Sequence, residues 1–203
     1  MITSAIETKE GRDVAIIDIP GAYIHTYVDK HGKEKMIMLF KGKLAKLMVM
    51  VDSKLDRKSV TTDSKGNTML YVQMNKALYG LLQSMLLFYK KVKKDLKTYG
   101  FKINPFGPCV VNAMISGCQM TMTVTWHVDD LKLSHKNPIE ITKCATYLAS
   151  IYGEKLSVKR GKVHDYLDMY LNYSEKGSAK VSMIKYTGKV LRGFPEKVTG
   201  STA

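Results

Sequence analysis

Three aspartates stand where a carboxylate needs a specific reason to be. Asp18 lies in the apolar, β-branched run at residues 14–19, where an unpaired buried charge costs several kcal/mol or forces a pKa shift. Asp129 and Asp130 are adjacent like charges between two strand-like segments. A divalent cation among them would relieve both problems, and oxygen ligands suit Mg²⁺ or Mn²⁺. Two such ions can activate an attacking 3′-hydroxyl and stabilise a leaving pyrophosphate.

Each aspartate also has a purely structural interpretation. Asp18 precedes Ile19-Pro20-Gly21 and can form an Asx turn, while Asp-Asp is an ordinary dipeptide of exposed turns. Taken singly, each residue fits this interpretation better. Taken together on a strongly basic chain, the three favour a site for metal and phosphate, although spacing alone does not decide between the two readings.

The chain of 203 residues is strongly basic. It has 32 Lys and Arg against 18 Asp and Glu, a net charge of +14, which favours a polyanionic partner over a merely solvated lysine-rich surface. No apolar run approaches the roughly 20 residues of a membrane span, and no signal peptide opens the chain. Three dispersed cysteines read as reduced thiols. We therefore expect no membrane partner. We expect an intracellular protein of the cytoplasm or nucleus, a location that includes virus-like particles.

The elements that would position the aspartates are short strands. Residues 14–19 predict a buried central strand that stops at Pro20-Gly21. Residues 119–128 alternate apolar and polar side chains, and the alternation resumes at residues 131–134, which predicts two half-buried strands. Asp129-Asp130 would then be the two-residue turn of a hairpin.

Helices and further strands complete the expected frame. Residues 78–99 predict a helix with lysines on one face and an apolar face made of Leu78, Leu81, Leu82, Met85, Tyr89, Val92, Leu96 and Tyr99. A second helix at residues 137–151 has Asn137 as N-cap and Glu140 placed for a capping box. Strands are expected at 163–173 and 180–183, a short helix at 186–194, and a β-rich stretch at 36–51 within an insertion. This order predicts an α+β fold of the ferredoxin-like kind, an antiparallel sheet with helices on one face.

Five ordered segments carry a resemblance to a known family. They are His127-Val128-Asp129-Asp130, Asp18-Ile19-Pro20-Gly21-Ala22-Tyr23, Lys76-Ala77-Leu78-Tyr79-Gly80-Leu81-Leu82-Gln83, His164-Asp165-Tyr166-Leu167-Asp168-Met169, and the helix at 186–194. Together they resemble the reverse transcriptase, or RNA-dependent DNA polymerase, domain of copia-type LTR retrotransposons. The chain departs from that pattern at His127, where the family has an aromatic residue, and at Asp168, where it has glycine. An Asp there must turn outward or disturb the strand.

The resemblance implies a polymerase palm at residues 12–27 and 74–195, with a partial fingers-like insertion at 28–73 and a tail at 196–203. Asp18, Asp129 and Asp130 would be catalytic and would hold Mg²⁺ or Mn²⁺, with the Ile19 carbonyl as a further ligand. Tyr23 would lie under the sugar of the incoming nucleotide and exclude a 2′-hydroxyl, unless it is an ordinary core aromatic. Gln83 would approach the nucleotide or template. The primer end would be held by Tyr166, Leu167 and Met169.

The implied reaction is the addition of deoxynucleoside triphosphates to a DNA primer on an RNA template. The basic fingers segment of the family would precede residue 1, and a thumb and ribonuclease H would follow the last residue, so we expect a truncated fragment of a retrotransposon polyprotein. The alternative is a catalytically inactive, basic nucleic-acid-binding remnant, the product of a decaying gene copy. Nothing in the sequence indicates an oligomeric state.

Overall fold

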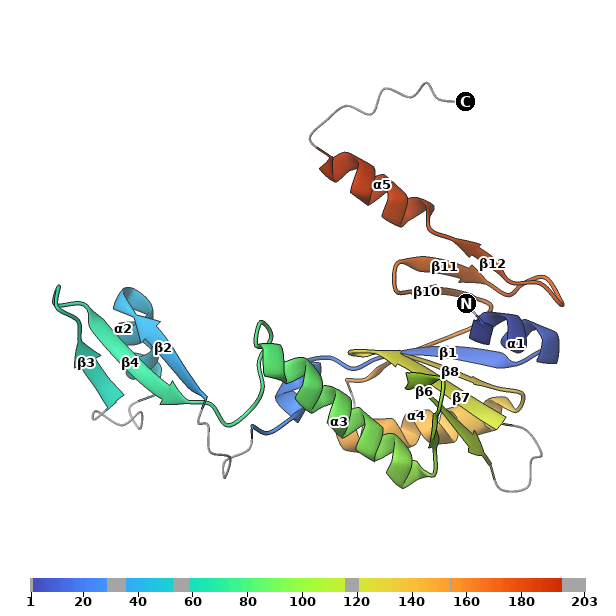
Figure 1. The fold of residues 1–203 in the computed structure, drawn as a ribbon, viewed down its shortest axis with the longest axis horizontal. Helices are drawn as coiled ribbons and strands as arrows, with labels where there is room; N and C mark the ends of the chain where they lie inside the picture. The colour runs from blue at the N-terminus through green and yellow to red at the C-terminus, as the bar shows by residue number, and fades with distance from the viewer. Residues whose placement is uncertain (1, 29–35, 53–58, 116–120, 154, 195–203) are drawn as a thin grey trace. The chain divides into compact units, whose positions relative to one another are not determined.

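The structure, a computed structural model, describes residues 2–28, 36–52, 59–115, 121–153 and 155–194 (Figure 1). Two compact units make up the chain. One comprises Met1–Ala22 and Lys91–Ala203, and the other comprises Tyr23–Lys90. Each unit has a β-sheet of its own. The predicted division into palm, fingers-like insertion and tail stays a prediction, and the tail lies outside the described residues.

The larger unit is built on a six-stranded antiparallel sheet. In spatial order its strands are β5 (Lys102–Asn104), β6 (Gly107–Met114), β7 (Thr121–His127), β8 (Asp130–His135), β1 (Asp13–Asp18) and β9 (Ser157–Arg160). The β-branched run of β1 pairs with β8 on one side and β9 on the other, which confirms it as a buried central strand. Counting only β1, β7, β8 and β9 with helices α3 and α4, the chain follows a β-α-β-β-α-β order.

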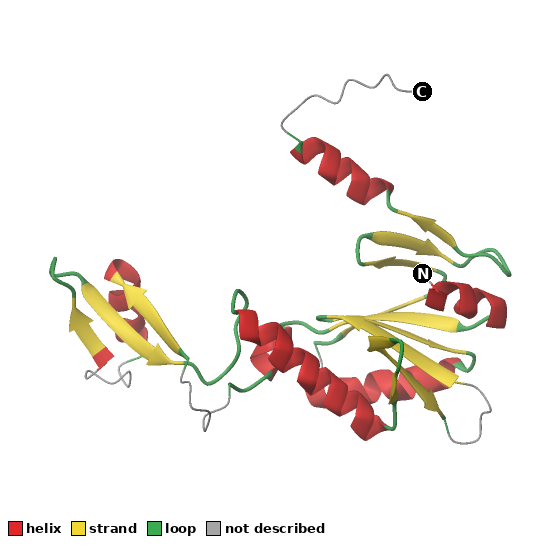
Figure 2. Ribbon diagram, viewed as in Figure 1, coloured by secondary structure: helices red, strands yellow, loops and turns green. Residues whose placement is uncertain are grey.

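Two long helices cover one face of this sheet (Figures 1 and 2). They are α3 (Leu82–Tyr99), of which residues from Lys91 onward belong to this unit, and α4 (Pro138–Tyr152). The Tyr152 hydroxyl donates to Asp95 Oδ2 at 2.6 Å and joins the two helices. The N-cap of α4 is confirmed, since Asn137 accepts a hydrogen bond from the Ile139 N–H at 3.0 Å. The capping box is wrong, because the Asn137 N–H donates to His135 Nδ1 and Glu140 pairs with Lys143.

The opposite face of the sheet is covered by α1 (Ile2–Glu10) and by a small three-stranded sheet. The strands of the small sheet are β10 (Val163–Tyr166), β11 (Met169–Asn172) and β12 (Lys180–Ser182), and helix α5 (Ile184–Gly193) follows them. Tyr166, Leu171 and Tyr173 pack against Val14 and Ile16 of β1. The expectation of helices on one face alone is therefore wrong, because α1, which the sequence analysis did not predict, lies on the other face.

The smaller unit is a three-stranded sheet with one helix against it. Its elements are η1 (Ala22–His25), β2 (Ile37–Lys41), α2 (Gly42–Val51), β3 (Val60–Thr62) and β4 (Thr68–Gln73), in the sheet order β2-β4-β3. The predicted β-rich stretch at 36–51 is thus half wrong. The strand ends at Lys41, and Gly42, with a φ of 60°, allows the chain to turn into a helix that packs through Ala45.

Three further expectations are corrected. The helix predicted at 78–99 begins at Leu82, and its buried residues are Ser84, Phe88, Val92 and Leu96, at four-residue spacing. Leu82 and Met85, assigned to the apolar face, are exposed. The strand predicted at 163–173 is a hairpin that turns at Leu167-Asp168.

Several strands were not predicted, and part of one lies outside the described residues. Strands β3, β5, β6 and β9 have no prediction in the sequence analysis, because stretches without strict alternation resemble loops. The alternation of β7 is confirmed for its described residues, with Met122, Val124 and Trp126 buried, while residues 119 and 120 lie outside the description. Strand β8 is buried on both faces rather than half-buried, since α1 covers its polar side.

Candidate functional site

Four polar residues form a row across the sheet at one end of β1. Asp18 pairs directly with Asp130 of β8 on one side and with Ser157 of β9 on the other. Asp130 in turn pairs with His127 of β7. Directly opposite residues on neighbouring antiparallel strands point to the same face, with Cβ atoms about 4.5–5.5 Å apart. The fold therefore places two of the three sequence-predicted aspartates side by side, from strands more than 100 residues apart in the chain.

The third aspartate lies in the turn beside this row. The hairpin turn consists of Val128 and Asp129, so its predicted position at Asp129-Asp130 is wrong by one residue. Asp130 is the first residue of β8 and keeps a defined facing. The backbone carbonyl of Asp129 accepts a hydrogen bond from the Ile19 N–H at 3.1 Å, which ties the turn to the end of β1.

The turn holds a valine in an unfavourable backbone conformation. Val128 has a φ of 53°, in the left-handed region that β-branched residues rarely adopt. A positive φ at the first turn residue alone is the pattern of a type II′ turn, whose usual residue at that position is glycine. Strain of this kind collects at functional sites, where the surrounding structure holds it in place.

The electrostatics of the row can be read from Asp130. Partial burial raises the pKa of this carboxyl, and the neighbouring charges of Asp129 and Asp18 raise it further. His127 and Lys159 act in the opposite direction and lower the pKa of the same group. Lys159 belongs to β9 and pairs with Ile16, so it stands on the same face, one step along the strand from the row. The charges of Asp129 and Asp18 thus oppose ionisation of Asp130, and a bound cation would offset that repulsion.

The carboxylates of the row suit a divalent cation that takes part of its shell from a substrate. Among the described residues, no three His, Cys, Asp or Glu side chains close around one point as a complete metal-binding group. Mg²⁺, however, commonly binds proteins through one or two carboxylates and completes its shell with water and substrate phosphates. Asp18 and Asp130 supply two carboxylates on one face, and Asp129 lies in the turn directly before Asp130.

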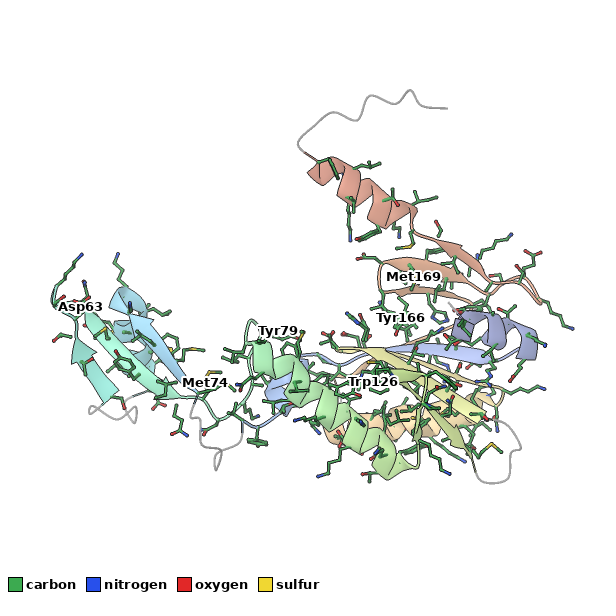
Figure 3. The ribbon with its side chains drawn as sticks, in the orientation of Figure 1. Asp63, Met74, Tyr79, Trp126, Tyr166 and Met169 are labelled. Carbon is green, nitrogen blue, oxygen red and sulfur yellow. The ribbon has the colours of Figure 1, made fainter. Side chains whose placement is uncertain are left out.

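The hairpin of β10 and β11 borders the same face of the sheet. Tyr166 is buried, its pKa is raised chiefly by burial and also by Asp130, and Met169 packs against the cluster that contains it (Figure 3). Leu167 and Asp168 form the turn with φ values of 52° and 59°. Asp168, at the position where the resembling family has glycine, therefore occupies a turn that favours glycine or Asp. Its exposed carboxylate forms an ion pair with Lys189 of α5 at 3.0 Å.

A buried ion pair lies next to the row. Lys132, two residues after Asp130, is 3% exposed and contacts Glu7 of α1, itself 2% exposed, at 2.9 Å. Its ammonium also donates to the hydroxyls of Thr3 and Ser4. The Tyr173 hydroxyl donates to Glu7 Oε2 at 2.7 Å. This network fixes α1 to the face that carries the aspartates.

The remaining predicted site residues belong to the smaller unit. Tyr23 is 6% exposed and packs against the rings of Tyr79 at 4.4 Å and Phe88 at 6.0 Å between centroids. These contacts are those of the core aromatic that was the structural alternative for Tyr23. Gln83 lies in the first turn of α3 and is exposed.

Sequence reasoning missed Ser157, Lys159 and the Lys132–Glu7 pair. Ser157 and Lys159 follow α4 in a strand too short to show a period, so only the sheet register identifies them as neighbours of Asp18. One signal for the ion pair was present. Lys132 stands among the apolar residues Leu131 and Leu133 directly after the Asp pair, a position where a charge needs a partner.

Comparison with known proteins yields little. No family model matches the sequence, and no curated protein is similar to it. Among solved structures, apo telomerase from Candida tropicalis is similar with 11% identity and a TM-score of 0.43, over 88% of this chain and 35% of that chain. Telomerase from Candida albicans in complex with the TWJ fragment of telomeric RNA gives 11% identity and a TM-score of 0.43, over 89% and 34%.

The chain thus spans about a third of the length of these telomerases. A likeness at this TM-score establishes neither a common fold nor a common function. What the structure itself shows is a mixed α+β protein with antiparallel sheets. No described helix is long and apolar enough to cross a bilayer.

Proposed function

We propose that this chain is the palm part of an RNA-directed DNA polymerase, a reverse transcriptase of the copia-type retrotransposon kind, with a partial fingers subdomain in the smaller unit. The observation that carries the proposal is the direct pairing of Asp18 with Asp130 across β1 and β8, with Asp129 in the adjoining turn. Motifs resembling those of the family supply these aspartates from two strands, β1 and β8, that are far apart in the sequence. The β-α-β-β-α-β order agrees with a palm-like sheet, and the basic net charge of +14 agrees with a nucleic-acid partner.

The proposed roles are those that the resemblance implies for these residues. Asp18, Asp129 and Asp130 would hold Mg²⁺ or Mn²⁺, with the Ile19 carbonyl nearby. Two such ions, when bound, activate a primer 3′-hydroxyl and stabilise the leaving pyrophosphate. Tyr166, Leu167 and Met169 would position the DNA primer on its RNA template. Tyr23 and Gln83 would bind the incoming deoxynucleoside triphosphate, and Tyr23 would do so by excluding a 2′-hydroxyl.

Metal titration tests the proposal without depending on polymerase activity. We expect the full chain to bind Mn²⁺ saturably in calorimetric titration. The double variant Asp129→Asn/Asp130→Asn should bind at least about tenfold more weakly, since even changes outside the ligand shell cost that much. The substitutions keep side-chain size and remove two charges, so they test the ligands and not the packing.

A matched control removes two other carboxylates. Asp165→Asn/Asp168→Asn changes the charge of the same unit by the same amount, at two exposed residues of the β10–β11 hairpin. This variant should bind Mn²⁺ as the unchanged chain does. Equal affinity for all three proteins would show that the aspartate row holds no metal, and the polymerase proposal would fail.

A second candidate function rests on the net charge of +14. A basic α+β module that has lost catalysis would still bind RNA or DNA, because neutralised phosphates release counterions whatever the state of the aspartates. This candidate predicts nucleic-acid binding without metal binding. It differs from the first in one measurable respect, since neither the unchanged chain nor the Asp129→Asn/Asp130→Asn variant would then bind Mn²⁺ at the aspartate row.

A further inference from the structure

A pocket of about 440 Å³ opens between α1 and the β5–β6 hairpin, within the larger unit. We call it the α1 pocket. Its volume falls in the range of small-molecule sites. It is separate from the aspartate row, which supplies none of its lining residues. Its walls are apolar and come from Ile2 and Ile6 of α1 and from Phe106 and Val110 of the hairpin.

The floor of the α1 pocket is polar and includes the buried hydroxyl of Ser134. Ser134 of β8 is 1% exposed, and its Oγ has no hydrogen-bond partner among the described residues. A buried polar group in this condition costs free energy and calls for an explanation. Ser134 lines the pocket, so a bound polar atom would satisfy it.

The other floor residues offer mainly donors. Asn112 Oδ1 accepts from the Thr123 hydroxyl at 2.9 Å, and Asn104 Oδ1 accepts from the Phe106 N–H at 2.9 Å. Each of these carbonyl oxygens already accepts one hydrogen bond, and the NH₂ groups of both amides can donate to a ligand. The Arg12 guanidinium, 6% exposed, adds further N–H groups beside them, while one of its nitrogens donates to Thr123 Oγ1. A ligand with hydrogen-bond acceptors therefore matches the donors of this floor.

The charge of the floor limits that ligand to one negative charge. Glu10 accepts a hydrogen bond from Arg12 Nε at 2.9 Å and offsets part of the guanidinium charge. A multiply charged phosphate would meet this carboxylate nearby, whereas a single carboxylate matches the donors and the remaining charge. We propose that the α1 pocket binds a small amphipathic acid, an apolar body that carries one carboxylate. The apolar body lies between Ile6 and Phe106, and the carboxylate faces Arg12 and Ser134.

Titration of the full chain with 2-naphthoate tests this site by calorimetry and by amide chemical shifts. We expect saturable binding with one ligand per chain and shift changes centred on Arg12, Asn112 and Ser134. The neutral analogue 2-naphthalenemethanol should bind roughly tenfold more weakly, because a hydrogen bond to a charged acceptor is worth more than a neutral one. Equal affinity for the two ligands, no saturation, or shifts centred elsewhere would overturn the proposal.

Two variants separate the floor from the wall. Ser134→Ala should weaken 2-naphthoate binding about 3- to 10-fold, the size expected of one hydrogen bond. Folding should be kept, since the hydroxyl has no partner to lose among the described residues. Phe106→Ala alters a side chain that is 98% exposed, so folding should be unaffected while affinity for both ligands falls. Ser150→Ala, an exposed serine of α4, is the matched control and should leave affinity unchanged. Unchanged affinity in both pocket variants would also overturn the proposal.

Discussion

At the scale of single residues, the site combines crowded charge with backbone strain. Asp130 is held beside two other carboxylates, and Val128 holds a left-handed conformation two residues earlier. Both features cost free energy in the folded chain. An ionised carboxyl is more stable away from like charges, and a β-branched residue is more stable at negative φ. Both can therefore be tested through stability, independently of any reaction.

The raised pKa of Asp130 makes its charge a destabilising element at neutral pH. A carboxyl whose folded pKa lies above its ordinary value of 3.8 binds its proton more tightly in the folded state, so stability falls as the pH rises through that window. Asp130→Asn removes the charge. In EDTA at pH 7 we expect a melting temperature higher by roughly 1–3 °C, a small gain because the group is partly exposed.

The size of this effect must depend on pH. Below pH 3.8 the unchanged protein carries a neutral Asp130, so the gain of the Asn variant should vanish. Thermal melts at pH 7 and pH 3.5 provide the comparison. A variant that melts lower than the parent at pH 7 without metal would show that the three carboxylates do not repel one another.

The left-handed Val128 predicts a stabilising glycine substitution. Val128→Gly relieves a conformation that costs about 1–2 kcal/mol, and it loses about 0.5–1 kcal/mol through the greater freedom of the unfolded chain. We expect the free energy of unfolding in urea to rise by about 0.5–1 kcal/mol. Val158→Gly, at an exposed valine of β9 with ordinary strand conformation, should lower it. A loss of stability in both variants would exclude strain at the turn.

At the scale of elements, the sequence predicts where helices and strands occur better than it predicts which of their faces are buried. The long α3 was predicted, yet its buried face was assigned to Leu82 and Met85 in place of Ser84 and Phe88. The helix is apolar on more than one side over its first turns, so periodicity alone selects no face there. Further along, Val92 and Leu96 were assigned correctly, because lysines occupy the other sides.

The corrected burial of α3 gives a direct comparison of two apolar side chains. Leu96 is fully buried, and Leu96→Ala should lower the free energy of unfolding by about 2–5 kcal/mol through lost burial and a cavity. Met85 is 53% exposed, so Met85→Ala should change it by less than about 0.5 kcal/mol. Urea denaturation of both variants measures the difference. Equal losses of unfolding free energy in the two variants would support the buried face that periodicity alone suggests.

The buried Lys132–Glu7 pair makes α1 an integral part of the sheet. Lys132→Met leaves the Glu7 carboxylate buried without its main partner and should cost about 3–5 kcal/mol of the free energy of unfolding. The double variant Glu7→Leu/Lys132→Met removes both charges and should recover most of that loss. Denaturation of the two single variants and the double variant gives the coupling between them. Additive costs would mean that the two side chains do not interact.

At the scale of the whole molecule, the net charge of +14 is the property that the sequence determines without ambiguity. We expect the chain to bind single-stranded RNA with an affinity that falls linearly with salt on logarithmic axes. Fluorescence anisotropy between about 50 and 200 mM salt measures the slope. Asp129→Asn/Asp130→Asn should bind at least as tightly, since it adds two positive units of charge. Affinity that does not depend on salt would contradict a phosphate-binding surface.

The overall architecture was predictable only in part, because strands that pair in the sheet lie far apart in the sequence. Strand β1 and the β7–β8 hairpin follow from local patterns, and the α+β class follows from their order. The neighbours of β1 do not follow from local patterns, because β8 and β9 reach it from over 100 residues away. Helix α1 and the partner of Lys132 depend on the same long-range contacts. The aspartates were therefore identifiable as residues, while Ser157 and Lys159 became visible only in the sheet register.

That register has a consequence for which lengths of chain the site can tolerate. One residue inserted between Asp130 and Leu131 would leave the core pairing of β8 in place and turn Asp130 to the opposite face of the sheet. Two inserted residues would restore the facing but move the carboxylate about 7 Å along the strand, out of step with Asp18. Extra residues in the β6–β7 connection would disturb neither relation. Changes in loop length therefore leave the aspartate row intact, whereas the insertion of even one residue within β8 separates its members.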